Sequence, residues 1–387
     1  MERYSSLRGR GLLFLLFLWF IWFVNFSVRI VFAPILPIVE DEFMVNHGQA
    51  SSIFIFLSAG YGVAVIFSGL FSGKFGYRRS IVLSLGLLSL VAFLIPLVQK
   101  FFLLYLFALV LGFSVGFYLP AAIPLITEYY LEKDWGKAIA IHDTGASSAI
   151  FATPFVALFL LYFFPWRGIF VVFGCFYVVC SLSFYFFSTE VKIASPPKAV
   201  FHDIIRMGSL WLMALLWIFG AGANLGVYSI IPLYLTKELG LDIGYANTIL
   251  GISRLGSVFV AVACGFLIDK FNLRKIMFLV MVITSVFTVL LGTVSVKYMG
   301  IVLFLQAFFV TGFFPVGLVA IAKAFRREMR SLATGIILAL AIAFGGGIIP
   351  YLLGVSGDLY SFRLGIVILG ALVGLFSTLV FRLEELE

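Results

Sequence analysis

The stretch ASSIFIFLSAGYGVAVIFSGLFSGKFGYRR, residues 50–79, has a gap-free counterpart in ANTILGISRLGSVFVAVACGFLIDKFNLRK, residues 246–275. The offset of 196 is about half of the 387-residue chain. The identical pairs are Ala50/Ala246, Ile53/Ile249, Gly60/Gly256, Gly69/Gly265, Lys74/Lys270, Phe75/Phe271 and Arg78/Arg274. A second match joins VGFYLPA (115–121) to VTGFFPV (310–316) at an offset of 195. Because two matches rarely fall at nearly the same offset by chance, we infer two halves in parallel repeat.

The composition indicates the class of protein. The chain is 63% hydrophobic and only 11% charged, whereas soluble domains are about 45–50% apolar and about 25% charged. Its apolar runs are continuous and long enough to cross about 30 Å of hydrocarbon, which favours helices over a β-barrel. We therefore predict an all-α membrane protein with twelve transmembrane helices in two six-helix bundles. The predicted spans are 11–37, 51–71, 80–97, 102–127, 138–163, 168–187, 209–235, 245–268, 275–295, 299–322, 332–355 and 363–381.

The basic residues predict the orientation. With both termini cytoplasmic, nineteen of the 26 lysines and arginines lie at the cytoplasmic side and five at the other side, as the positive-inside rule requires. The net charge of +8 is therefore a matter of topology and does not indicate nucleic-acid binding. The predicted organisation is an N-terminal half (1–187), a cytoplasmic linker (188–207) and a C-terminal half (208–387). We expect a monomer in the cell (inner) membrane, with the first span retained because no A-x-A-like cleavage pattern follows it.

The loop after the second span of each half carries a recognisable motif. GLFSGKFGYRR (69–79) and GFLIDKFNLRK (265–275) resemble the pattern G-x-x-x-D-[RK]-x-G-[RK]-[RK] of the major facilitator superfamily. The matching residues are Gly69, Lys74, Gly76, Arg78 and Arg79 in the first copy, and Gly265, Asp269, Lys270, Arg274 and Lys275 in the second. Six plus six helices and a mid-chain loop extend the resemblance over nearly the whole chain. In character the chain is closest to the prokaryotic branches that transport organic anions and carboxylates.

The resemblance implies a transporter and not an enzyme, with no cofactor and no metal. Substrate would bind near the bilayer midplane between two rigid halves that rock. Arg78 and Asp269 would belong to the cytoplasmic gate. The first motif has Gly73 where the family usually has Asp, and the second has Asn272 in place of a usual Gly. These departures leave the gate salt bridge of the N-terminal half without its usual carboxylate.

Two arginines lie within the predicted spans, Arg29 in the first and Arg254 in the eighth. A guanidinium at membrane depth costs about 2.5–3.5 kcal/mol on insertion scales, and buried charges normally pair. No Asp or Glu is predicted at comparable depth. One interpretation is structural, with each arginine bonded to carbonyls or reaching an interface. The other is that an anionic substrate supplies the missing charge, because a guanidinium binds carboxylate with two parallel hydrogen bonds.

Polar and aromatic neighbours extend this candidate site. Asn25 and Arg29 are four residues apart on one helix face, and Asn224 and Tyr228 repeat that spacing in the counterpart seventh span. Asn247 shares a face with Arg254 in the eighth span. Tyr118 and Phe314, beside the paired prolines, are candidates for an aromatic cavity wall. Each Asn or Tyr could instead form a simple interhelical hydrogen bond.

His142 and Asp143 are a second candidate cluster, near the cytoplasmic end of the fifth span. A histidine titrates in the physiological range and could carry a coupling proton. The alternative is that both residues belong to the cytoplasmic gate and pair with the basic loop 74–79. The sequence leaves both roles open.

These observations favour a secondary transporter for a small organic anion, a carboxylate above all, in symport with protons by alternating access. An alternative is an exporter of hydrophobic or lipid-like compounds, with the arginines structural or bound to headgroups. A non-transporting membrane sensor is a further alternative. An intramembrane enzyme fits worst, because no metal cluster and no Ser/His pair lies at matching depth. The three cysteines (Cys175, Cys180 and Cys264) all fall within apolar spans and indicate neither a disulfide framework nor a metal site.

Overall fold

The computed structural model describes residue 4 and residues 7–189, 201–256, 259–260, 263–264, 268 and 270–386. The described chain divides into two compact units, and the predicted linker 188–207 contains the division after Pro196. Unit 1 comprises Met1–Phe32 and Phe56–Pro196, and unit 2 comprises Ala33–Ile55 and Pro197–Glu387. The segment Ala33–Ile55 thus packs with the C-terminal half of the sequence.

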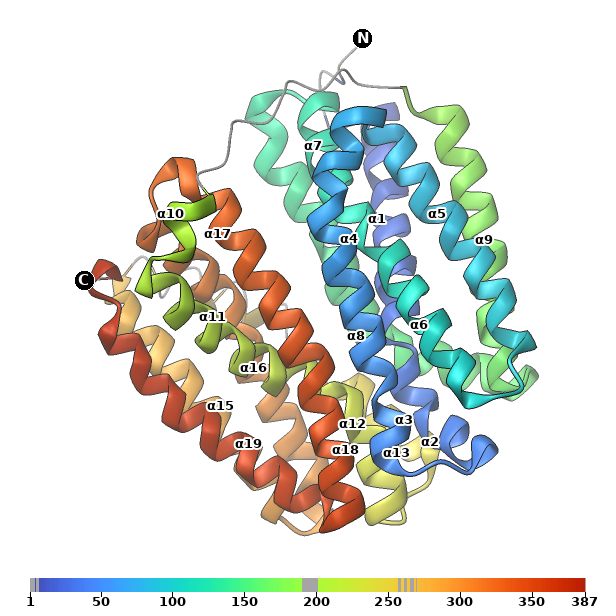
Figure 1. Cartoon of the computed structure of the whole chain (residues 1–387), viewed down its shortest axis with the longest axis vertical. Coiled ribbons are helices and arrows are strands. Elements are labelled where there is room, and N and C mark those ends of the chain that lie inside the picture. Colours follow the sequence, from blue (N-terminus) through green and yellow to red (C-terminus); the bar gives the residue numbers. More distant parts are fainter. Residues whose placement is uncertain are drawn as a thin grey trace. The chain divides into compact units, whose positions relative to one another are not determined.

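Unit 1 consists of long helices. They are α1 (Arg10–Ile30), α4 (Ile53–Phe75), whose first turn belongs to unit 2, α5 (Tyr77–Leu94), α6 (Phe101–Gly116), α7 (Tyr118–Tyr129), α8 (Trp135–Phe163) and α9 (Trp166–Phe187). Within this unit α1 packs against α8, and α5 packs against α9 (Figure 1).

Unit 2 repeats this design with more interruptions. Its elements are α2 (Phe32–Phe43), α3 (His47–Ser51), α10 (Phe201–Ile205), α11 (Gly208–Ala221), η3 (Gly222–Gly226), α12 (Val227–Leu233), η4 (Tyr234–Glu238), α13 (Ile243–Ser253), α15 (Leu273–Thr293), α16 (Val296–Ala324), α17 (Arg327–Leu340), η5 (Ala341–Ile348), α18 (Ile349–Leu359) and α19 (Phe362–Ser377). The segments η3, η4 and η5 are π-helical. In Figure 1, α15 and α19 lie side by side.

The number of membrane-spanning helices in the structure is consistent with the twelve predicted spans. Eleven stretches of described residues are long and apolar enough to cross a membrane. The predicted span 245–268 begins with α13 and continues into a region of which part is not described. The prediction of an all-α membrane protein is confirmed, and twelve spans are consistent with the structure.

The internal repeat is visible in the packing of the second span of each half. A Cβ added at Gly60 would lie 1.9 Å from the carbonyl oxygen of Leu109 on α6. A Cβ added at the matching Gly256 would lie 2.5 Å from the ring of Phe308 on α16. Because α6 and α16 are the fourth helices of their halves, the paired glycines permit the same close helix approach in both.

Local sequence explains where several helices begin and end. Pro34 has no N–H to donate to the carbonyl of residue 30, and the first span is interrupted at Val31, between α1 and α2. Side chains cap four helix starts in the described chain: Asn46 accepts from the Gln49 N–H at 2.7 Å, Asp242 from Tyr245 at 3.1 Å, Asn272 from Lys275 at 3.3 Å and Ser361 from Leu364 at 3.1 Å. Such caps satisfy backbone donors that the helix leaves unpaired.

Candidate functional site

Arg254 follows directly after α13, and its guanidinium lies inside unit 2. The residue is 3% exposed. Its Nη1 donates to Oδ1 of Asn224 at 2.6 Å, and its Nη2 donates to the Asn224 carbonyl at 3.3 Å. The guanidinium carbon lies 5.1 Å from the centroid of the Tyr228 ring. The structure thus brings together three residues that the sequence analysis singled out separately.

Arg254 lies against the π-helical turn η3, which contains Asn224. A π-helical turn is wider than an α-helical one and is frequent at functional sites. Here two successive carbonyls of η3 accept hydrogen bonds from side chains. The Ala223 carbonyl accepts from Gln306 Nε2 at 2.8 Å, and the Asn224 carbonyl accepts from Arg254. Gln306 also donates to Thr288 Oγ1 at 3.2 Å, which fixes the amide between two helices.

Arg29 lies inside unit 1 and has a different set of neighbours. The residue is 7% exposed, and its guanidinium carbon lies 4.5 Å from the Tyr61 ring centroid and 5.6 Å from that of Phe26. Arg29 makes no hydrogen bond and no ion pair with any residue that the structure describes. Cation–π contacts contribute up to about 2 kcal/mol each when desolvated. They leave all five guanidinium N–H donors without an acceptor in the described chain.

Asn25 lies one turn before Arg29 on α1 and is fully buried. Neither its Nδ2 nor its Oδ1 bonds to any described residue. A buried amide without partners is rare in a native protein and requires an explanation. An incoming polar ligand would supply partners for both Asn25 and Arg29.

Tyr61 is the main residue that the sequence analysis missed. Spans 1 and 2 correspond by the repeat to spans 7 and 8, so the two arginine–tyrosine pairs use equivalent helices. Span 1 supplies the arginine in unit 1, whereas span 7 supplies the tyrosine in unit 2. A signal was present, because Arg254 aligns with Ser58, one turn before Tyr61.

The remaining predicted substrate contacts have identifiable neighbours. Asn247 is fully buried and its Nδ2 donates to the Pro34 carbonyl at 3.0 Å, which ties α13 to the start of α2 inside unit 2. The Phe314 ring lies edge-on to Trp217, with centroids 5.6 Å apart. The Tyr118 hydroxyl lies 2.9 Å from the Leu18 carbonyl and 3.1 Å from His142 Nε2. Contact of these residues with substrate stays a prediction.

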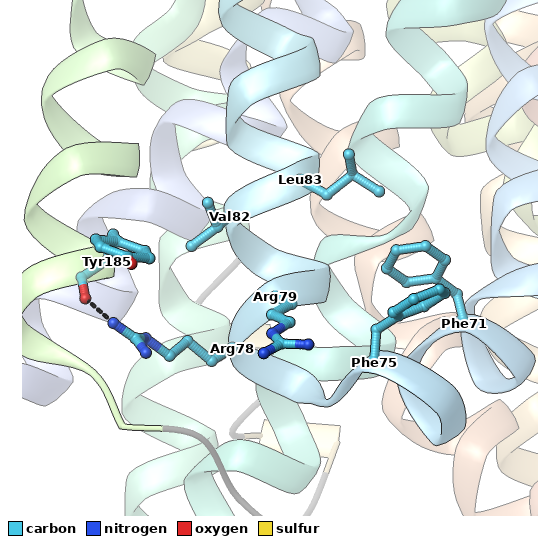
Figure 2. Close-up of a pocket in the computed structure, with 7 residues that line it drawn as sticks. All are labelled: Phe71, Phe75, Arg78, Arg79, Val82, Leu83 and Tyr185. Atoms are coloured by element: carbon cyan, nitrogen blue, oxygen red, sulfur yellow. Dashed lines mark hydrogen bonds between the residues drawn. The ribbon is translucent and has the colours of Figure 1, made fainter.

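Arg78 lies in a pocket of about 370 Å³ at the α4–α5 turn. Its guanidinium stacks on the ring of Tyr185 at 4.5 Å and donates to the Tyr185 carbonyl (Figure 2). Phe71 and Phe75 form the opposite wall. Asp269, the other residue predicted for the cytoplasmic gate from the loop motifs, is outside the described residues. Among the described residues, no ion pair joins Asp143 to the loop 74–79.

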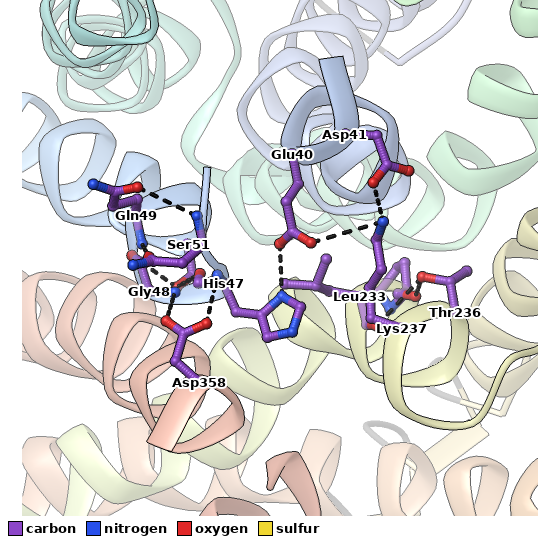
Figure 3. A network of polar contacts seen from close by, with 12 residues as sticks. Glu40, Asp41, His47, Gly48, Gln49, Ser51, Leu233, Thr236, Lys237 and Asp358 are labelled. Carbon is purple, nitrogen blue, oxygen red and sulfur yellow. Dashed lines mark hydrogen bonds and ion pairs between the residues drawn. The ribbon is translucent and has the colours of Figure 1, made fainter. Parts of the chain in front are cut away.

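A network of charged residues at one end of unit 2 was not predicted. Glu40, with a side chain 7% exposed, accepts a hydrogen bond from His47 Nδ1 at 2.8 Å and lies 3.7 Å from Lys237 Nζ (Figure 3). Lys237 also pairs with Asp41. Asp358 accepts from the backbone N–H groups of residues 47 and 48, at 2.9 and 2.7 Å. The network fastens α2 and α3 to η4 and α18, which explains why the segment Ala33–Ile55 belongs to unit 2.

The fold therefore defines a class: a polytopic helical membrane protein built from a repeated six-helix design, with a buried arginine in each unit. The sequence profile described as Major Facilitator Superfamily matches residues 18–263 and 219–387. The chain belongs to the Major Facilitator Superfamily. It is a membrane transporter and not an enzyme, as the resemblance of its loop motifs indicated.

Known relatives agree with this assignment, and solved structures share the fold. The chain is 25% identical over 268 residues to a TsgA homolog of Buchnera aphidicola, covering 68% of this chain and 67% of that one. It is 24% identical over 289 residues to the probable nitrate transporter NarT of Staphylococcus haemolyticus, covering 70% of each. A bacterial homolog of the human lysosomal transporter Spinster, inward-facing and unoccupied, superposes with a TM-score of 0.82 at 16% identity over 95% of both chains. A D-xylose–proton symporter superposes with a TM-score of 0.79 at 16% identity, over 97% of this chain and 98% of that one.

Proposed function

We propose that this protein transports a small organic anion, a carboxylate above all, by alternating access in symport with protons. We place it as a monomer in the cell inner membrane, with both termini in the cytoplasm. The observation that carries the proposal is Arg29, a buried guanidinium that the described chain provides only with aromatic rings.

Several features support an anion as the missing partner. Asn224 provides Arg254 with two neutral acceptors, its amide oxygen and its carbonyl, which orient the guanidinium. The unpaired amide of Asn25 offers both a donor and an acceptor beside Arg29. One relative, the probable nitrate transporter, is named for an anionic substrate. A planar guanidinium matches the two oxygens of a carboxylate, so it provides shape recognition as well as charge.

The test uses the purified protein in proteoliposomes. A thermal-shift screen and an uptake screen should span monocarboxylates, dicarboxylates, phosphate esters, nitrate and sulfonates, with and without a pH gradient. Arg254→Ala is expected to abolish uptake while the protein still folds, and Arg254→Lys is expected to impair it, because an ammonium cannot make the paired contact.

Arg167→Ala is the matched control. Arg167 also lies over an aromatic ring, that of Trp166 at 4.5 Å, and donates to a carbonyl at 2.8 Å, but it lies at the start of α9. Its loss should leave uptake close to the wild-type rate. Full uptake by Arg254→Ala would refute the proposed function.

A further inference from the structure

We propose that Nδ1 of His142 is the atom that binds the coupling proton, and that Tyr118 holds the imidazole in the tautomer that leaves Nδ1 open. The inference rests on the proposed symport and adds the atom and the positioning residue to it. All of the residues that carry it lie in unit 1.

The tautomer follows from two hydrogen bonds. The Tyr118 hydroxyl lies 2.9 Å from the Leu18 carbonyl, and a carbonyl can only accept, so the hydroxyl proton points to Leu18. The same oxygen lies 3.1 Å from His142 Nε2 and is left to act as an acceptor. Nε2 must therefore carry a hydrogen. The neutral ring then has its basic lone pair on Nδ1, which is buried and bonded to no described residue.

The surroundings suit a ring that changes charge. His142 is fully buried. Its ring lies nearly parallel to Trp22, with centroids 5.8 Å apart at 13°, and to Tyr118, at 5.8 Å and 23°. Burial favours the neutral imidazole, whereas aromatic faces attract an imidazolium. The two effects oppose each other, so a charge placed near the ring changes how readily Nδ1 takes up a proton.

The other titratable groups nearby do not occupy Nδ1. Tyr177 and Cys180 lie on α9, and the Tyr177 hydroxyl donates to the Val24 carbonyl at 2.9 Å. Asp143, the neighbour on α8, is exposed, and its carboxyl interacts with Trp22, the residue whose ring lies against His142. On α1 the buried charged group is Arg29, seven residues beyond Trp22 on the same helix face.

The spacing between Trp22 and Arg29 lets the charge at Arg29 affect protonation of His142. Trp22, whose ring lies against His142, is seven residues from Arg29, which is about 10 Å of helix. A unit charge about 10 Å away changes a protonation equilibrium roughly tenfold at an effective dielectric constant of about 20. An anion bound at Arg29 would offset the cation and favour a proton on Nδ1. In the same way a proton on Nδ1 would favour the anion. His142 takes up one proton from the solution on the side where the anion binds. It releases this proton to the solution across the membrane when the anion dissociates there.

The first experiment compares two kinds of transport by His142→Gln in proteoliposomes. Glutamine keeps an N–H donor near the Nε2 position but cannot take up a proton. We expect accumulation driven by an inward proton gradient to fall at least tenfold, while exchange of labelled for unlabelled anion stays within about twofold of wild type. Wild-type accumulation by the variant would overturn the inference. Failure of the proposed function is a different result, in which wild-type protein neither binds nor exchanges any anion.

The second experiment tests the positioning role with a matched pair of variants. Tyr118→Phe and Tyr177→Phe each remove a buried hydroxyl that donates to an α1 carbonyl, but only the first contacts His142. We expect Tyr118→Phe to displace the pH profile of uptake and Tyr177→Phe to leave it unchanged. Equal profiles for both variants would contradict the inference.

A third measurement does not depend on transport. In protein carrying ¹⁵N-histidine and the substitutions His47→Gln and His202→Gln, the remaining signal belongs to His142. We expect Nε2 to stay protonated across the titration and Nδ1 alone to change. A neutral ring with its proton on Nδ1 would overturn the tautomer argument.

Discussion

Asn224→Asp tests the anion site at Arg254 by turning the amide that accepts from this arginine into a carboxylate. The new carboxylate has the shape of the amide that it replaces, and Oδ1 already lies 2.6 Å from Arg254 Nη1. The bond from the cationic guanidinium then ends on an anion and no longer on a neutral acceptor, which strengthens it in the folded protein. We expect the thermal midpoint to stay the same or rise.

The expected loss of anion binding follows from the same distance. An anion held by the guanidinium would lie about 4 Å from the new carboxylate, where like charges repel by about 4 kcal/mol at an effective dielectric constant of about 20. Since about 1.4 kcal/mol corresponds to a factor of ten, the affinity should fall by two to three orders of magnitude. Equilibrium binding by anion-induced thermal shift and initial uptake rates in proteoliposomes measure this loss.

A structural role for Arg254 predicts the opposite outcome. If the arginine only packs helices, an added counter-ion stabilises the protein and leaves transport unchanged. Asn46→Asp is the control, because Asn46 caps α3 through its Oδ1, at 2.7 Å from the Gln49 N–H, and aspartate caps equally well. Wild-type affinity in Asn224→Asp, together with a raised midpoint, would refute the reasoning.

Three further outcomes are expected. Arg29→Gln should weaken anion binding about 10- to 100-fold, since hydrogen bonds to charged groups contribute about 1.5–3 kcal/mol; unchanged affinity would assign Arg29 to packing. Gly112→Ala should lower the thermal midpoint, because its Cβ would lie 1.9 Å from a backbone oxygen of α4. Gly86→Ala should be neutral or stabilising, because its Cβ would meet no described residue of another element within 4 Å. Lys237→Met should speed amide hydrogen exchange in α2 and α3 about 10- to 100-fold, because it removes the lysine partner of the buried Glu40; unchanged exchange would show that this lysine does not hold the two helices.

Much of the fold could be predicted from the sequence because membrane insertion is read from local properties. Long apolar runs, short loops and a 196-residue offset are properties of neighbouring residues, and they were sufficient for the helices and the repeat. The motif at 69–79 was sufficient for the family. The two intramembrane arginines were also evident, because charge is conspicuous where hydrocarbon is expected.

The partners of those arginines depended on tertiary structure. Tyr61 is one of many aromatic residues in the apolar spans. Only helix packing places its ring centroid 4.5 Å from the guanidinium carbon of Arg29. The tautomer of His142 required a hydroxyl from α7 and a carbonyl from α1 at the same time. The ties between Ala33–Ile55 and the C-terminal half join residues some 200–310 positions apart.

The sequence by itself thus determined that this chain spans a membrane as two repeated halves with a cation in each. It could do so because hydrophobicity and charge act residue by residue. Only the tertiary structure decided which groups meet those cations, because a contact between helices depends on rotation and register, which no single segment encodes.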